Sequence, residues 1–187
     1  MIRYLALLLC LLGCGLLGKG GWIEAKAWLA EGLIASAWQQ TLAGQGAVPP
    51  WPWADTQPVA KLESPRLGVE RWVLSGDSGR TLAFGPGWSE YTTAPGEEGR
   101  SFISGHRDTH FHFLKDLQVG DRLIIQKPDG NRVDYQVAEI GVINQGEGWR
   151  LPIDGPQELL LITCYPFDAL TPGATQRYIV RAELKAQ

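Results

Sequence analysis

The chain has 187 residues, of which 44% are hydrophobic and 20% are charged. This balance is typical of a globular protein with one domain and some peripheral material, and it excludes a disordered chain. The formal net charge is −3 and no cluster of Lys and Arg stands out. Nucleic-acid binding requires a basic surface, so we exclude DNA and RNA as partners.

An apolar, uncharged run occupies residues 4–18, directly after Arg3. It is short for a membrane span, which needs roughly 20 apolar residues. Three interpretations stay open: residues 1–21 are an uncleaved signal anchor, the chain is lipidated at Cys14, or the run is a cleaved signal peptide. Each interpretation exports the rest of the chain. We therefore expect a periplasmic or otherwise extracytoplasmic domain attached to the inner (cytoplasmic) membrane.

Residues 22–43 are rich in Ala and Leu and predict an amphipathic helix. Its tryptophans suit a helix that packs on the protein itself and equally one that lies at the membrane surface. Residues 44–58 are rich in proline and predict an extended linker. Within this linker, Trp51 and Trp53 indicate that it docks on another part of the molecule.

Residues 59–187 carry short β-rich runs between turn signals. The predicted strands are residues 69–76, 81–85, 100–105, 121–127, 131–143, 158–164 and 176–184. The run KPDGN at 127–131 separates two of these strands and predicts a hairpin. This many short strands favours a mainly β fold that closes into a barrel, because closure removes exposed sheet edges. One stretch of the domain, residues 108–117, has a brief helical pattern.

Cys164 is the one cysteine of the exported part, because Cys10 and Cys14 lie in the apolar run. A lone cysteine in an oxidising compartment is either buried and inert or a reactive thiol. Cys164 ends an apolar strand that Pro166 stops, so we expect the thiol at an open end of the barrel. Arg177 begins the next strand. If the two strands are neighbours, its guanidinium lies near the thiol and favours the charged thiolate.

His106 follows the predicted strand 100–105 and can face the same end of the barrel. Imidazole exchanges protons near neutral pH. A thioester mechanism needs a sulfur nucleophile, a proton carrier and a donor for the developing oxyanion. Cys164, His106 and Arg177 are the candidates for these roles. His106, His110 and His112 also suggest a metal site, but the segment offers no nearby Cys and no clear ligand geometry, so we expect no metal.

The segments that carry these residues resemble the sortase family. The run LLLITC at 159–164 is similar to the family signature T-L-x-T-C, which is followed by an arginine on the adjoining strand, here Arg177. The run SFISGHRDTHF is similar to the segment that carries the family's histidine, here His106. SPRLGV at 64–69 and SGDSGRTLAFGPG at 75–87 look like the first strands of the family's barrel. Leu160 replaces the first Thr of the signature, and we expect it to point into the core.

This resemblance implies an eight-stranded sortase-type β-barrel over residues 59–187 and a transpeptidation reaction. Cys164 would cleave an LPxTG-like C-terminal sorting motif of an exported target protein through a thioester, and an amine acceptor would resolve it. His106 would carry the proton and Arg177 would hold the carbonyl oxygen, without a metal or organic cofactor. The N-terminal helix also resembles that of small proteobacterial (Gram-negative) sortases, which act on a dedicated target protein.

Two other functions stay open. An exported cysteine protease would use the same residues with water as the acceptor. A non-catalytic, membrane-anchored β-barrel would bind a partner and keep Cys164 as a buried thiol. An L,D-transpeptidase is excluded, because its motif places an arginine two residues after the cysteine, where this chain has Pro166.

Overall fold

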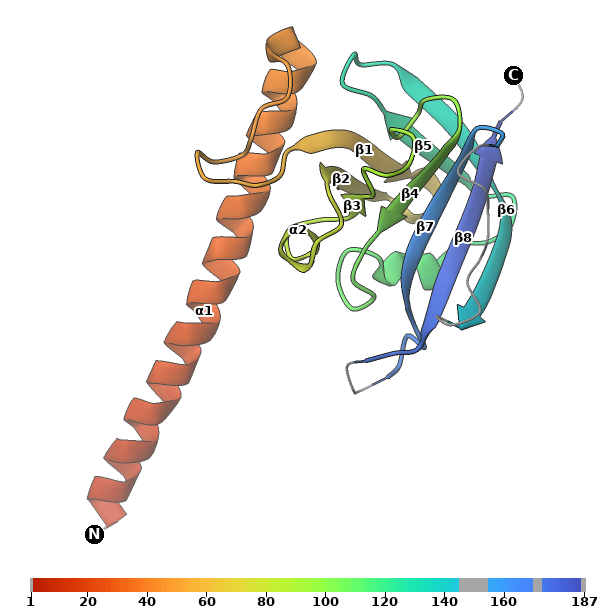
Figure 1. Ribbon diagram of the computed structural model, residues 1–187. Helices are drawn as coiled ribbons and strands as arrows, with labels where there is room; N and C mark the ends of the chain where they lie inside the picture. Colours follow the sequence, from red (N-terminus) through yellow and green to blue (C-terminus); the bar gives the residue numbers. More distant parts are fainter. Residues whose placement is uncertain (1, 145–154, 170–172, 186–187) are drawn as a thin grey trace.

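Figure 1 shows the computed structural model, which describes residues 2–144, 155–169 and 173–185. A long helix, α1 (Ile2–Gln40), continues into a helical turn, η1 (Thr41–Gln45), and an extended segment leads from there into the strands. The strands are β1 (Pro58–Ser64), β2 (Val69–Ser75), β3 (Gly87–Trp88), β4 (Arg100–Ser104), β5 (Arg122–Gln126), β6 (Arg132–Asn144), β7 (Glu158–Tyr165) and β8 (Gln176–Leu184). In the described residues, short helical segments lie between the strands: η2 (Pro65–Leu67), α2 (Gly79–Leu82) and η3 (His112–Asp116).

The strands form a closed barrel in the order β1-β2-β3-β4-β7-β8-β6-β5. Most neighbours are antiparallel, whereas β2 and β3 run parallel, as do β4 and β7. Strand β1 pairs with both β2 and β5, which closes the ring and leaves no free edge at this point. The prediction of a mainly β, closed eight-stranded barrel is therefore confirmed.

The core of the barrel is built from one face of each strand. Its buried members include Leu62, Ile103, Leu123, Ile125, Tyr135, Val137, Leu159, Leu161 and Val180, together with Phe111 and Leu114 from the region of η3. Side chains alternate between the two faces of a strand. Because Leu159 and Leu161 point inward, Leu160 and Cys164 lie on the outer face of β7. Leu160 is 1% exposed, so it is buried as expected, but it lies outside the interior cluster.

The hairpin at KPDGN is confirmed. Strands β5 and β6 are antiparallel, with Gln126 opposite Arg132. The backbone N–H of Lys127 donates to the carbonyl of Asn131 at 2.8 Å, which closes the turn. Gly130 has a φ of +84°, a conformation that glycine adopts without steric cost.

Two strand predictions are wrong. Residues 81–85 do not form a strand, because Ser78 caps a short helix there: its hydroxyl accepts a hydrogen bond from the Thr81 N–H. The run SPRLGV is a turn rather than a strand, since Pro65 begins η2 and Gly68 ends it in the left-handed conformation. The sequence-based prediction also missed β1 and β3.

The C-terminal half of α1 packs on the barrel beside β1 and β2 (Figure 1). Ala30, Ile34 and Trp38 are buried in this contact. Closer to the N-terminus the helix extends beyond the barrel, and Trp22 and Trp28 are 63% and 78% exposed. No helix in the described part of the chain is long and apolar enough to span a bilayer.

The segment between η1 and β1 packs on the barrel through Trp51, on the side of the barrel that also contacts α1. The ring of Trp51 meets that of Phe84 edge to face, with 5.1 Å between the ring centroids. Trp53 is instead 83% exposed.

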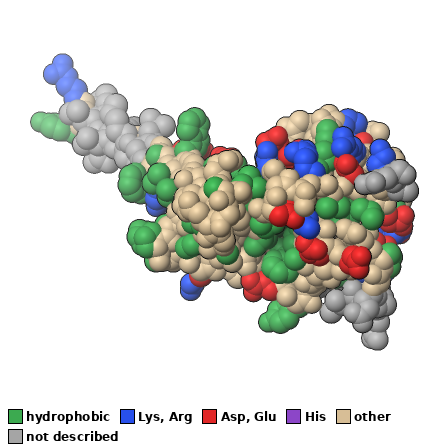
Figure 2. All heavy atoms as spheres, turned by 90° about the horizontal axis from the view of Figure 1, so that it is seen from above, with side chains coloured by type: hydrophobic (Ala, Val, Ile, Leu, Met, Phe, Trp, Pro, Cys, Tyr) green, Lys and Arg blue, Asp and Glu red, His purple; other side chains and the backbone are tan. Residues whose placement is uncertain are grey.

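A buried ion network lies on the outer face of β4, β7 and β8, at the end of β7 away from Cys164. Arg100 donates to the Glu158 carboxylate at 2.5 Å, and Arg181 donates to the same carboxylate at 2.9 Å. The Glu158 side chain is 5% exposed. Other charges are spread over the surface: Figure 2 shows side chains of both signs interspersed on one face of the barrel.

We expect Glu158→Gln to lower the free energy of unfolding by about 3–5 kcal/mol, because it removes the carboxylate that the buried guanidinium of Arg100 binds. Asp55→Asn is the matched control, since Asp55 pairs with Arg80 on the open surface at 3.4 Å. It should cost no more than about 1 kcal/mol. Urea denaturation of both variants measures the difference, and equal losses would contradict a buried network.

Candidate active site

Strand β7 brings Cys164 and Arg177 together, because it is antiparallel to β8. Cys164 stands directly opposite Arg177 in the register of the two strands. Paired residues on neighbouring strands point to the same face, so both side chains lie on the outer face of the barrel. Strands β7 and β8 are thus neighbours, as the sequence analysis required for the Arg177 guanidinium to lie near the Cys164 thiol.

The other edge of β7 is parallel to β4, and this pairing brings His106 to the same place. Ser104, the last residue of β4, is the partner of Ile162. The N–H of Gly105 donates to the Ile162 carbonyl at 3.1 Å, which extends the ladder past the end of the strand. His106 follows at the level of Cys164. The strand pairing thus places Cys164 and Arg177 on the outer face of β7 and β8, and the chain reaches His106 in the turn that follows β4 beside the same end of β7.

A side-chain hydrogen bond from Thr163 fixes the turn that leads into His106. The Thr163 hydroxyl donates to the Gly105 carbonyl at 2.7 Å, and Thr163 is 2% exposed. Gly105 also packs against the ring of Phe111, where a Cβ atom would lie 2.7 Å from two ring carbons. Thr163 points inward, so its function is to fix the backbone beside the thiol.

The three candidate residues differ in exposure. Cys164 is a partly exposed free thiol, and His106 is exposed. Arg177 is half-buried and donates to the carbonyls of Ala174 and Gln176 at 2.7 and 3.0 Å. A partly exposed thiol opposite an arginine on the neighbouring strand is typical of a reactive cysteine rather than an inert one.

The remaining two histidines face other surroundings. Lys115 Nζ lies 2.6 Å from His112 Nε2, and the His112 ring meets that of Phe167 edge to face. His110 lines a pocket on the side of α1. The described residues contain no group of three His, Cys, Asp or Glu side chains that could hold a metal ion.

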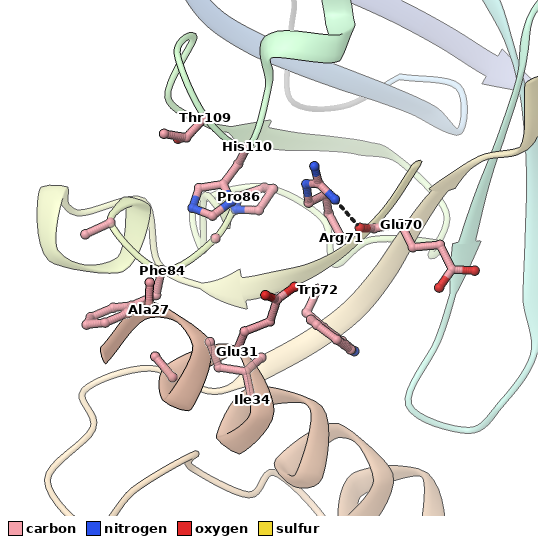
Figure 3. Close-up of a pocket in the computed structure, with 13 residues that line it drawn as sticks. Ala27, Glu31, Ile34, Glu70, Arg71, Trp72, Phe84, Pro86, Thr109 and His110 are labelled. Atoms are coloured by element: carbon pink, nitrogen blue, oxygen red, sulfur yellow. Dashed lines mark hydrogen bonds between the residues drawn. The ribbon is translucent and has the colours of Figure 1, made fainter. Parts of the chain in front are cut away.

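The pocket beside His110 has a volume of about 320 Å³ and lies between α1 and the barrel (Figure 3). Ala27, Glu31 and Ile34 of α1 form one wall of the pocket, and Arg71 and His110 line the side of the barrel. Burial lowers the pKa of His110, which favours its neutral form. His110 therefore belongs to the contact with α1.

Arg107 is a residue of this region that the sequence analysis did not single out. It is 7% exposed, and its Nε donates to Asp108 Oδ1 at 2.8 Å. This hydrogen bond holds the pKa of Asp108 below its usual range and raises that of Arg107. In the sequence, Arg107-Asp108 has the pattern of a solvated charged loop, so nothing local indicates that the guanidinium is buried.

Known proteins similar to this chain share one family description. Residues 62–185 match the family model described as a sortase domain. Sortase D of Bacillus subtilis (strain 168) is 30% identical over 120 residues, and the match covers 64% of this chain and 60% of that protein. The solved structure of a Clostridium perfringens sortase D5 transpeptidase is 27% identical, with a TM-score of 0.59, over 70% of this chain and 80% of that chain. Streptococcus agalactiae sortase C1 is 26% identical, with a TM-score of 0.60, over 70% of each chain.

We expect Thr163→Val to destabilise the protein by about 1–3 kcal/mol, because the buried Gly105 carbonyl loses its side-chain donor while the volume is kept. Thr41→Val is the control: the Thr41 hydroxyl bonds to the Ala37 carbonyl, four residues earlier in the same helical stretch, at 3.1 Å. The control should cost less, since carbonyls inside a helix have backbone donors. Thermal denaturation measures both, and a larger loss in the control would contradict the role given to Thr163.

Proposed function

The chain belongs to the sortase family, whose members are in general cysteine transpeptidases, and from this premise we propose that Cys164, His106 and Arg177 catalyse transpeptidation. The observation that carries the proposal is the register of β7, which is paired with β8 at Arg177 and with the strand that ends before His106. A sulfur nucleophile, a proton carrier and a planar donor on one face are the parts that a thioester mechanism needs.

In the proposed reaction, Cys164 Sγ attacks the carbonyl carbon of the scissile peptide bond. The C–N bond breaks, the acyl group stays on sulfur as a thioester, and His106 gives a proton to the departing amine. An amine acceptor then attacks the thioester, His106 takes up its proton, and the thiolate leaves. Arg177 donates hydrogen bonds to the oxyanion of both tetrahedral intermediates.

The proposed substrate is an exported protein with an LPxTG-like C-terminal sorting motif, cleaved between Thr and Gly. The outer face beside Cys164 supports this choice. Phe102 and Ile162 are half-buried there and Ile179 is 2% exposed, so an extended peptide would meet an apolar surface next to the thiol. Such a surface suits the Leu and Pro side chains of the motif better than charged ones.

The proposed setting is the cytoplasmic membrane of a Gram-negative cell, with the barrel on the periplasmic side. The apolar run at 4–18 supports membrane attachment, and the exposed Trp22 and Trp28 fit the boundary between water and lipid. The partner would then be a dedicated target protein exported by the same cell.

We expect Cys164→Ala to abolish cleavage of an LPxTG-like peptide, because alanine provides no nucleophile at a partly exposed position where the fold does not depend on it. The double variant Cys10→Ala/Cys14→Ala is the matched control and should keep turnover. Mass spectrometry of the products, with and without a primary amine, separates the possible reactions. Hydrolysis alone would favour the protease, and an active alanine variant would exclude Cys164 as the nucleophile.

We expect Arg177→Lys to lower kcat by about 10²–10³-fold, because an ammonium does not reproduce the directed donors of the guanidinium. Arg181→Lys is the control on the same strand and the same face, within the ion network of Glu158. It should reduce stability but leave kcat per folded molecule near the wild-type value. A changed KM with a normal kcat in Arg177→Lys would assign Arg177 to substrate binding.

A further inference from the structure

Arg107 bonds to two segments that are far apart in the sequence. Its Nη1 donates to the Pro166 carbonyl at 2.5 Å and its Nη2 donates to the Ala169 carbonyl at 3.0 Å. Pro166 lies two residues after Cys164, whereas Arg107 directly follows His106. The Arg107 side chain thus connects the turn that carries His106 to the segment that follows Cys164.

The chemistry of arginine fits this span. The guanidinium is planar, with donors in a fixed fork, so it can bind a carboxylate on one edge and carbonyls on the other. On one edge, Arg107 Nε donates to Asp108 Oδ1 at 2.8 Å and Arg107 Nη2 donates to Asp108 Oδ2 at 3.3 Å. Because the Arg107 side chain is only 8% exposed, these acceptors replace its hydration shell and define one position for it.

Within the turn, the His106 carbonyl accepts a hydrogen bond from the Phe111 N–H at 3.0 Å, and Arg107 adds the bonds from this turn to the segment after Cys164. Thr163 holds the Gly105 carbonyl, which lies before His106, and Arg107 holds the chain after it. The imidazole is itself exposed, so the spacing between His106 and Cys164 depends on the backbone on either side of it.

We propose that Arg107 is a positioning residue, which ties the turn that carries His106 to the segment after Cys164 and so sets the spacing between imidazole and thiol. This inference rests on the proposed function only for its effect on turnover. Proton transfer requires hydrogen-bond distances, and a displacement of about 1 Å lowers a rate by roughly 10²-fold. Arg107→Gln should therefore lower kcat by roughly 10²-fold with little change in KM.

The spacing can also be measured without a substrate, through the rate at which iodoacetamide alkylates Cys164. In the described part of the chain, the charged and titratable groups on the elements around the thiol include His106, Arg107 and Asp108 in the turn after β4, Tyr165 and Asp168 after the thiol, and Arg177 and Tyr178 on β8. If the imidazole lies near the thiol, His106→Gln changes the alkylation rate between about pH 5 and 9. A double-mutant cycle then reports whether Arg107 maintains that coupling.

Arg66→Gln is the matched control. Arg66 also binds a carboxylate and a carbonyl: it donates to Asp121 Oδ1 and Oδ2 at 2.6 Å and to the Asp116 carbonyl at 2.6 Å. None of these bonds reaches the segments around His106 or Cys164. Loss of Arg66 therefore reproduces the loss of a clamped arginine without the proposed change in spacing.

In the wild-type and Arg66→Gln backgrounds, we expect His106→Gln to change the alkylation profile of Cys164. In the Arg107→Gln background, the same substitution should have at most about a fifth of that effect. Equal effects in all three backgrounds, or a kcat of Arg107→Gln within about threefold of wild type, would overturn the proposal. Thermal denaturation shows whether each variant is folded.

Arg107→Lys keeps the test decisive if the glutamine variant does not fold. Lysine retains the buried charge beside Asp108 but is a point charge, and it does not bind the carboxylate and both carbonyls in one geometry. We expect a smaller but clear loss of coupling between His106 and Cys164, and full coupling would contradict the clamp. A wild-type protein that turns over no sorting peptide would overturn the proposed reaction, while the alkylation cycle would still decide the role of Arg107.

Discussion

The pairing of β7 on both of its edges is the constraint on which the site depends. A strand with one parallel and one antiparallel neighbour cannot shift its register without breaking two ladders at once. Because side chains alternate, a shift of one residue would also turn Cys164 into the core and expose Thr163. The position of the thiol relative to Arg177 and to the turn at Gly105 is therefore a property of the sheet, not of flexible loops.

The same alternation divides the residues of β7 between two tasks. Leu159 and Leu161 fill the interior, whereas Glu158 and Cys164 lie on the outer face at opposite ends of the strand. Glu158 anchors one end through two arginines in a buried network, which stabilises the sheet where no reaction is proposed. At the other end Cys164 is partly exposed, and the buried Arg107 pairs with Asp108 in the turn after His106.

Features encoded by neighbouring residues could be predicted from the sequence, and those that depend on distant parts of the chain could not. The hairpin at KPDGN is local, and alternation around Tyr135 predicted the strand that follows it. Residues 81–85 have the composition of a strand, but the cap provided by Ser78 favours a helical turn. Strand β3 is two residues long, too short for any period to appear.

The candidate site shows the same division. Cys164, His106 and Arg177 each end or begin an apolar run, so a barrel predicted from those runs brings them to one rim. Arg107 gives no such signal, because two of its acceptors are carbonyls 59 and 62 residues away in the chain. Carbonyls belong to every residue, and no side-chain pattern can identify which of them an arginine will bind.

The contact between Gly105 and Phe111 has a consequence for redesign. The ring belongs to the interior cluster and lies where any side chain at position 105 would have to go. A protein engineer who grafts the histidine-bearing loop onto another barrel of the family must transfer the glycine and the aromatic ring together. A graft of the histidine alone, onto a turn with a different residue before it, would lift the loop away from the strand. The smallest portable unit therefore contains both Gly105 and Phe111.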